Sequence, residues 1–569
     1  MHLITELINY QIPPAIIMMC CVAIICLIPE KIRLQATIFA PIVTLFYVWQ
    51  IPIDNNANIS AYVKISIFDD LLPLYVHQFS HIFATIFCIA AFVGILYSIT
   101  FKNSAEIIIA LLYCSGALGV LFAGDLITLF FFWEFMAIFS TILIIFGKSD
   151  NAIKAGIRYA IMHFFGGVIL LIGIIIHMQF NESSLITNLT INYKIFEKFD
   201  LALLAPWLIL IGILINCATP PFSSWLPDSY PESSISGMLF LSAFTTKTAI
   251  FALIILFASN EILIYAGILM IFYGIIYALL ENNLRRLLAY SIITHLGFMV
   301  VAVGIGSQLA LYGAATQAFA HILYKTLALM VAGSVIHATG KTKLTELGGL
   351  YKYMPITMIC AVIAGLTISA TPLTAGFISK SLITASVHIP RYETIWYILV
   401  AASAGVLLHA GLLFPWLTFF NRKSNLLEKP KDPTILMKAA MILMCILCIA
   451  PGFYPNLIYF MLPQEVGYNP YSKGHAIVQL QILLFSSLAF FLLLPMLKRK
   501  EKISLDFDWF GRALLKYMLN ITYHFTFFIK ELICSNIYKL IQIIIKKYYQ
   551  SSNIIPSGSL YKHSRVNNS

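Results

Sequence analysis

The chain has 569 residues, of which 60% are hydrophobic and only 11% are charged, and its mean hydropathy is +0.88. Because about 25% of the residues in an ordinary soluble domain are charged, this composition excludes that class and predicts an all-α, polytopic membrane protein. The net charge of +11 does not indicate a nucleic-acid partner, because lysine and arginine collect in the cytoplasmic loops of membrane proteins. The expected partner of the apolar surface is the lipid bilayer.

Apolar windows of about 17–25 residues, the length that a membrane helix needs, recur along the chain. They lie near 13–29, 35–52, 71–99, 105–122, 126–146, 155–178, 202–219, 235–256, 261–280, 287–305, 309–337, 354–386, 395–418, 435–451 and 478–497. They predict about fourteen or fifteen transmembrane helices, depending on how the longer windows are divided. No small-residue cleavage site follows the first window, so we expect a retained helix rather than a signal peptide.

Basic residues follow the odd-numbered windows, beginning with Lys31 and Arg33, whereas the even-numbered loops carry fewer of them. The positive-inside rule places the odd loops in the cytoplasm. We therefore expect a multi-pass protein of the bacterial inner (cytoplasmic) membrane with its N-terminus outside. Segment 223–234, after the seventh window, breaks the alternation because it has acids and no bases.

The last part of the chain differs in composition. From Lys498 onward, apolar residues mix with regularly spaced lysines. We expect residues 498–569 to form a basic cytoplasmic tail along the membrane surface. A sixteenth span is the competing interpretation, and Lys530, Glu531 and Lys539 argue against it.

Proline interrupts two of the windows, at Asn216–Pro221 (NCATPP) and at Ser369–Pro372 (SATP). Proline removes a backbone donor and disrupts the helix around it. Carbonyls freed at membrane depth persist only where protein or a watery cavity surrounds them. A pair of interrupted spans in the two halves of a chain is typical of inverted-repeat transporters with sites near the midplane.

Glu134 lies near the centre of window 126–146. A lone ionised side chain at that depth costs about 2.5–3.5 kcal/mol, so the carboxylate must be protonated, paired with a cation or set beside a hydrated path. It could merely hold helices together. Because ionisable residues inside membranes usually mark ion or proton pathways, we interpret Glu134 as part of a proton path.

Three lysines are also set inside apolar windows: Lys247, Lys325 and Lys380. Burial favours the neutral amine, so a buried lysine can release its proton. His321 precedes Lys325 by four residues, which places both on one helix face. Snorkelling of the lysines toward an interface and a hydrogen-bonded core histidine are the structural alternatives. We predict a proton relay through these residues and Glu134.

Other polar residues in the windows predict less. His163 and His295 are each alone in an apolar run, so hydration or simple hydrogen bonding explains them nearly as well as an auxiliary role in the relay. The ten cysteines are scattered, and Cys445-x-x-Cys448 has no second pair or histidine cluster to complete a metal site. We expect no cofactor and no metal, since no nucleotide-binding or redox motif occurs.

Several ordered motifs together resemble the proton-translocating antiporter-like family. That family includes the D subunits of the Mrp-type multisubunit cation/proton antiporters and the membrane subunits of NADH–quinone oxidoreductase. The motifs are FWE at 132–134, PPFSSWLPDSYPE at 220–232, TTKTA at 245–249, LRRLLAYS at 284–291, HILYKTL at 321–327, LGGLYKYMP at 347–355 and GFISK at 376–380. LDFDWFGR at 505–512 resembles the tail of the D-subunit branch.

The resemblance implies two inverted five-helix repeats, each with a broken helix. It implies that Glu134 pairs with a lysine on a neighbouring helix, that Lys247 and Lys325 continue the central axis, and that Lys380 gates one exit. Much of the family has a lysine where this chain has Asn216. An amide cannot pair with Glu134 as a counter-ion, so either Lys247 takes over as partner or the first half-channel is altered.

The resemblance leads to five divisions and three candidate functions. The divisions are N-terminal helices (1–122), a first repeat (126–256), a second repeat (261–418), C-terminal helices (435–497) and the tail (498–569). The chain would be one component of an antiporter that exchanges protons for a monovalent cation, with Na⁺ expected, within a hetero-oligomer of membrane subunits. The alternatives are a proton-pumping component of an NADH–quinone oxidoreductase-type complex, which alone would make it part of an enzyme, and a non-transporting scaffold.

Overall fold

The computed structural model describes residues 12–51, 71, 74–197, 200–421 and 429–495, together with 509, 517, 530, 538, 539, 542 and 543. Residues 1–504 and 505–569 are two separate units. Most of the expected interfacial tail and of the LDFDWFGR motif lies outside the described residues. The seven described positions of the second unit are all helical.

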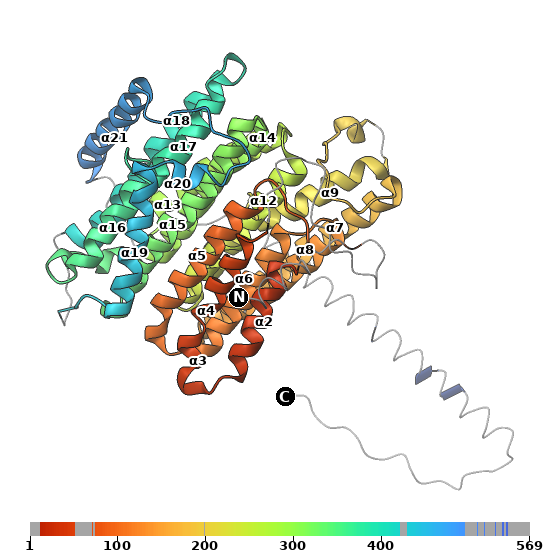
Figure 1. Cartoon of the computed structure of the whole chain (residues 1–569), viewed down its shortest axis with the longest axis horizontal. Coiled ribbons are helices and arrows are strands. Elements are labelled where there is room, and N and C mark those ends of the chain that lie inside the picture. The colour runs from red at the N-terminus through yellow and green to blue at the C-terminus, as the bar shows by residue number, and fades with distance from the viewer. Residues whose placement is uncertain are drawn as a thin grey trace, which may run out of the picture. The chain divides into compact units, whose positions relative to one another are not determined.

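Helices side by side form the first unit (Figure 1). Its α-helices are α2 (Pro14–Leu27), α3 (Glu30–Ala36), α4 (Phe39–Val48), α5 (Ser80–Ser98), α6 (Ser104–Leu121), α7 (Leu126–Ile145), α8 (Asp150–Asn181), α9 (Leu201–Asn216), α10 (Trp225–Ser229), α11 (Gly237–Ala243), α12 (Thr245–Phe257), α13 (Ile262–Leu280), α14 (Leu284–Ile305), α15 (Gln308–Thr339), α16 (Pro355–Ile368), α17 (Ala375–Val387), α18 (Glu393–Val406), α19 (Ile435–Phe453), α20 (Asn456–Tyr459) and α21 (Lys473–Leu493).

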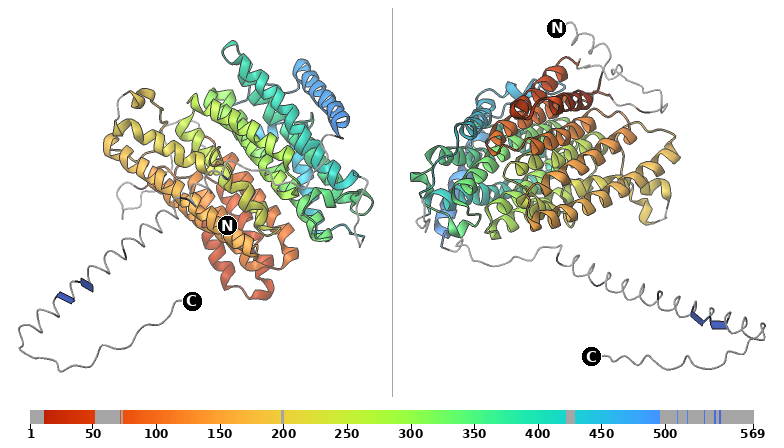
Figure 2. Two further views of the ribbon diagram at one scale, coloured as in Figure 1. Left: turned by 180° about the vertical axis from the view of Figure 1, so that it is seen from behind. Right: turned by 90° about the horizontal axis from the view of Figure 1, so that it is seen from below.

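The all-α polytopic prediction is confirmed. Every expected apolar window carries helix, and the described residues include 12 helices long and apolar enough to cross a membrane, with four shorter apolar helices beside them. Within the described part of the chain, β-pairing is limited to two isolated bridges. Helices α14 and α15 are almost wholly buried at the centre, and α21 lies at one edge (Figures 1 and 2).

The long helices begin at residues whose side chains accept hydrogen bonds from free backbone N–H groups. Asp125 caps α7, Ser149 caps α8, Asn283 caps α14 and Ser307 caps α15. These are the residue types preferred at helix N-termini. The isolated bridges also recur, Asp125 with Leu185 and Asn283 with Lys343. The segments α7–α8 and α14–α15 are therefore built alike, as expected for repeats. The exact repeat boundaries at 126 and 261 stay predictions.

Both proline-containing breaks are present, and their backbones match. After α9, the N–H groups of residues 217, 218 and 219 donate to the carbonyls of 213, 215 and 214; after α16, those of 369, 370 and 371 donate to 365, 367 and 366. Ala218 and Ala370 adopt left-handed φ angles of 57° and 56°. The Ala-Thr-Pro tripeptide thus ends two helices in the same way.

A third break lies at Phe244, between α11 and α12, where the sequence predicts one continuous helix. The Thr245 N–H donates to the Tyr113 hydroxyl (2.9 Å), and the Ser242 carbonyl accepts from Lys247. Groups freed by the break are therefore satisfied by side chains. The sequence has no proline or glycine at this point to signal it.

Basic residues of other helices bind the acidic segment 223–234, one through an ion pair and one through backbone carbonyls. Asp228 pairs with Arg158 of α8 at 3.1 Å. Arg285 of α14 donates to the carbonyls of Ser233 and Ser234, both at 2.8 Å. These contacts explain why a segment that breaks the charge alternation can lie beside basic helix ends.

Candidate functional site

Glu134 projects from α7 toward a glycine of α8. A Cβ atom added at Gly167 would lie 1.8 Å from Glu134 Oε1, so the carboxylate occupies space that only glycine leaves open. Oε1 is buried with no hydrogen-bond partner among the described residues. The implied ion pair with a lysine is wrong, because neither Lys247 nor any other described lysine pairs with Glu134.

Gly167→Ala is expected to displace the Glu134 carboxylate and to lower proton flux by about 10-fold or more, since a shift of about 1 Å in a reacting group can cost 100-fold. Proton flux into vesicles measures the effect. Gly474→Ala is the matched control, because nothing lies within 4 Å of its added Cβ. Unchanged flux in Gly167→Ala would show that the position of Glu134 is not critical.

Three residues of α8, Gly167, His163 and Tyr159, form what we call the α8 stripe, in which the histidine and the tyrosine carry the polar groups. These residues are four apart and share one helix face. The His163 ring stacks on Tyr159 at 3.9 Å and meets Trp225 edge-on at 4.5 Å. Asn216 is close enough to interact with His163 but outside hydrogen-bond geometry, so the polar atoms of both side chains are buried without a partner in the described chain. Such groups ordinarily bind internal water.

Tyr159 connects this stripe to the first turn of α12, which follows the break at Phe244 and contains Lys247. Its hydroxyl donates to Ser140 Oγ (2.9 Å) and lies 3.4 Å from Thr245 Oγ1, which is 2.5 Å from the Tyr113 hydroxyl. These hydroxyls join α6, α7, α8 and α12. These hydroxyls were not predicted from the sequence, because tyrosine and threonine in apolar helices carry no charge that would indicate a polar path.

Lys247 is completely buried. Its Nζ donates to the Ser242 carbonyl at the break and to Thr246 Oγ1 (3.2 Å). Helix α12, which carries Lys247, packs against α15, which carries His321 and Lys325. The structure thus places Lys247 on a helix beside the one that carries His321 and Lys325, while Glu134 lies beside Gly167 of α8; a relay through these residues stays a prediction.

The second half of the site is a cluster on α14 and α15. His321 and His295 have ring centroids 5.4 Å apart. His295 Nδ1 lies 2.8 Å from the Ser291 carbonyl. Both nitrogens of His321, and Nε2 of His295, have no hydrogen-bond partner within the described residues. His295, predicted as auxiliary, is therefore part of the same cluster as Lys325.

Lys380, on α17, is buried beyond this cluster. Its Nζ lies 4.6 Å from the centre of the Phe298 ring and has no hydrogen-bond partner among described residues. The neighbouring Ser379 donates to Gln317 (2.6 Å), which donates to the Tyr324 hydroxyl (2.9 Å). A polar contact chain thus runs from α17 toward the histidines on α14 and α15.

His409 was not predicted. It lies in a π-helical segment, Leu407–Leu413, that continues α18. Its Nε2 is 3.1 Å from Ser291 Oγ, the atom that also accepts from Lys325 Nζ at 2.5 Å. The only sequence signal was a single histidine in an apolar run, and its partner is 118 residues away.

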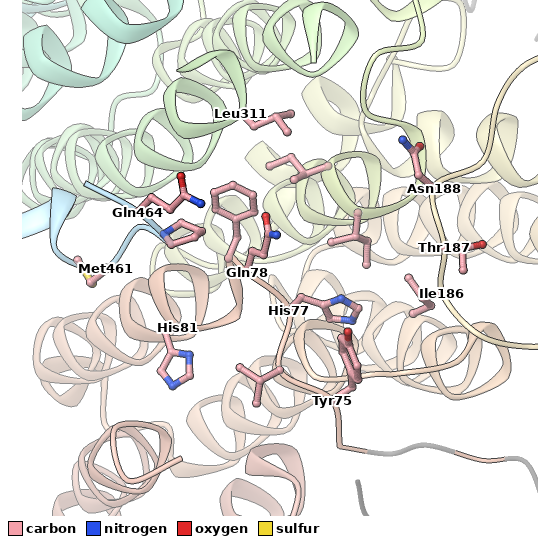
Figure 3. A pocket seen from close by; sticks show the side chains of 15 residues that line it. Tyr75, His77, Gln78, His81, Ile186, Thr187, Asn188, Leu311, Met461 and Gln464 are labelled. Carbon is pink, nitrogen blue, oxygen red and sulfur yellow. The ribbon is translucent and has the colours of Figure 1, made fainter. Parts of the chain in front are cut away.

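A pocket of about 490 Å³ opens at the ends of α5, α12 and α15. Figure 3 shows His77, Gln78, Asn188 and Gln464 around it. Burial lowers the pKa of His77 to about 4, against the opposing effect of its bond to the Ala123 carbonyl. The ring is therefore neutral at ordinary pH. The ring centroid of His77 lies 5.7 Å from that of Phe251, which is one turn along α12 from Lys247.

Comparison with known proteins identifies the family. Residues 123–408, about half of the chain, match the model of the NADH:quinone oxidoreductase/Mrp antiporter transmembrane family. The chain belongs to this family. The matched region includes the predicted site residues from Glu134 to Lys380 and also α18, but it ends one residue before His409.

Curated relatives of the family carry several names. The A/B subunit of a probable K⁺/H⁺ antiporter of Rhizobium meliloti is 30% identical over 358 residues, which are 61% of this chain and 36% of that protein. The M subunit of the NADH-quinone oxidoreductase of Pseudomonas aeruginosa is 30% identical over 312 residues (51% and 60%). The D subunit of the Na⁺/H⁺ antiporter of Alkalihalophilus pseudofirmus is 28% identical over 278 residues (47% and 56%). The chain spans between 36% and 60% of these relatives' lengths.

A solved structure of the family shares the fold. A chain of the Mrp complex from Dietzia sp. DQ12-45-1b superposes with a TM-score of 0.77 at 18% identity, covering 98% of this chain and 64% of that one. At this identity the match shows the architecture alone. Membership of the family and the membrane fold are thus shown without any reference to the predicted proton relay.

Proposed function

We propose that the chain is a membrane subunit of a monovalent cation/proton antiporter, in which protons move along a relay of buried residues. The observation that carries the proposal is the buried polar corridor. It runs from Glu134 along the α8 stripe to Thr245 and Lys247, and from there through His321 and Lys325 toward Lys380. Ionisable groups at this depth are rare and costly outside ion and proton paths.

Water is expected to complete this corridor. Direct hydrogen bonds do not link all the residues of the corridor. Buried polar atoms without a described partner occur on Glu134, His163, Asn216, His321 and Lys380. Buried polar groups normally have a partner, and a single water makes about three hydrogen bonds. In this proposal Asn216 orients a water beside His163. The half of the corridor between Glu134 and Lys247 then still conducts protons, although Asn216 replaces the lysine that much of the family has at this position.

Partners and cargo are proposed from the relatives and the surface. The outer face of α7 and α8 exposes large apolar side chains, including Phe131, Ile161, Phe165 and Val168, which suits lipid or another membrane protein of the assembly. We propose a hetero-oligomer in the bacterial inner membrane, with the N-terminus outside and the tail cytoplasmic. Na⁺ is the proposed counter-ion, and K⁺ is the competing one because a relative is named for it.

The test is antiport by the complete assembly. Co-expressed with its neighbouring subunits in a bacterium lacking its own antiporters, the chain is expected to support release of protons from everted vesicles on addition of Na⁺. A response to K⁺ alone would replace Na⁺ as counter-ion. No flux with any partner combination would contradict the proposal and favour a scaffold.

A respiratory role is the second candidate, because the M subunit of an NADH-quinone oxidoreductase is as similar to this chain as an antiporter component is. Purification in mild detergent separates the two. Flavin- and iron–sulfur-containing partners would select the respiratory complex, in which the relay would be driven by redox chemistry in other chains. Partners that are membrane subunits alone would select the antiporter.

A further inference from the structure

Ser291 Oγ forms hydrogen bonds with both Lys325 and His409, and the direction of these bonds can be assigned. His409 Nδ1 lies 2.8 Å from the Gly405 carbonyl, and a carbonyl can only accept. Nδ1 therefore carries the proton of the neutral ring, and Nε2 is an acceptor. The partner of Nε2 is the Ser291 hydroxyl, which must donate to it.

The other side of Ser291 is equally defined. Lys325 Nζ has no lone pair to offer when charged and donates to Ser291 Oγ at 2.5 Å. The three groups are thus aligned in one direction, from the lysine N–H through the serine O–H to the histidine ring nitrogen. The gaps between Lys325 and Lys380, by contrast, contain atoms without partners among the described residues.

From this alignment we infer that His409 is the immediate proton partner of Lys325, with the Ser291 hydroxyl as the bridge. The inference rests on the proposed proton relay and adds a branch to it. Lys325 gives a proton to Ser291 Oγ while the serine hydroxyl proton passes to His409 Nε2. The products are a neutral amine, a serine hydroxyl that holds the former lysine proton, and an imidazolium.

The location of His409 supports a role for it beyond packing. The residue is completely buried and lies in a π-helical turn, a rare conformation that is frequent at functional sites. This segment packs against α13, α14, α16 and α21. The branch therefore leads from Lys325 on α15 to the segment that continues α18.

Four variants in the complete assembly test the inference. His409→Gln keeps an amide oxygen for the Ser291 hydroxyl but cannot carry a proton, and Ser291→Ala removes the bridge. Each is expected to lower proton flux by about 10-fold or more. The double variant is expected to lose little further, because both act on one step. Ser291→Thr is expected to recover most of what Ser291→Ala loses, and His337→Gln, at the exposed end of α15, is the matched control.

Membrane levels of each variant, measured by immunoblot, separate lost flux from lost protein. Proton flux in His409→Gln within about twofold of the wild type would overturn the inference, even if flux in Ser291→Ala is impaired. Ser291 would then act only as a hydrogen-bond acceptor for Lys325. Failure of the wild type to move protons would contradict the proposed function instead.

A second measurement decides the His409 inference in either case. Infrared difference spectra between acidic and neutral pH are expected to show an imidazole band that disappears in His409→Gln and shifts in Lys325→Met. A wild-type spectrum whose imidazole bands are the same in both variants would overturn the inference.

Discussion

Glu134→Gln is expected to reduce antiport by the complete assembly by about 100-fold, to the background of vesicles without the protein. Glutamine has nearly the shape of glutamate, so it fits the space beside Gly167 that holds the carboxylate. It cannot bind and release a proton. The variant therefore tests proton transfer with little disturbance of packing, and the decay of a pH gradient on addition of Na⁺ measures it.

Two further substitutions make this result specific. Glu134→Asp keeps the carboxylate but withdraws it by one methylene, about 1.5 Å, and is expected to retain partial flux. Glu182→Gln, at the exposed end of α8, is the control and should behave as wild type. Full flux in Glu134→Gln, with normal amounts of protein in the membrane, would remove Glu134 from the relay.

The sequence predicted those features of the fold that depend on local chemistry. Apolar windows give helices because a backbone in hydrocarbon must satisfy its own hydrogen bonds. The breaks near Pro220 and Pro372 follow from the missing N–H of proline. The buried lysines were found because charge within an apolar run is conspicuous in a single sequence.

Features that depend on distant contacts were beyond prediction. The break at Phe244 is satisfied by Tyr113, which lies 132 residues from Thr245. The sequence did not indicate a role for His409, because its hydrogen-bond partner Ser291 is distant in the chain. The Glu134–lysine pair that the resemblance implied is absent among the described residues, and the sequence already departs from the family there, because Asn216 stands where much of the family has a lysine.

The uncharged side chains of the proposed corridor were also not predicted from the sequence. Tyr159 and Thr245 place hydroxyls between the α8 stripe and Lys247, although neither residue type stands out among apolar neighbours. Charge alone therefore indicated the ionisable residues of the proposed corridor but not the hydroxyl groups between them.

Lys247→Met is expected to abolish proton flux, by about 100-fold, while leaving the protein folded. Lys247 is completely buried, and burying a charge is costly enough that an apolar side chain of similar volume is often neutral or stabilising in its place. The Ser242 carbonyl loses a donor, which opposes that gain by about 1–3 kcal/mol. Thermal unfolding of the purified chain in detergent should therefore occur within a few degrees of the wild type, so lost flux would report on the relay.

Lys247→Arg distinguishes proton transfer from simple positive charge. Arginine keeps the charge and can still donate to the Ser242 carbonyl, but it is not deprotonated in proteins. If Lys247 must release its proton between Thr245 and Lys325, the arginine variant is as inactive as the methionine one. Retained proton flux in Lys247→Arg would mean that the residue supplies only a permanent positive charge and does not release its proton. Lys154→Met, at an exposed lysine of α8, controls for the loss of one positive charge from the chain.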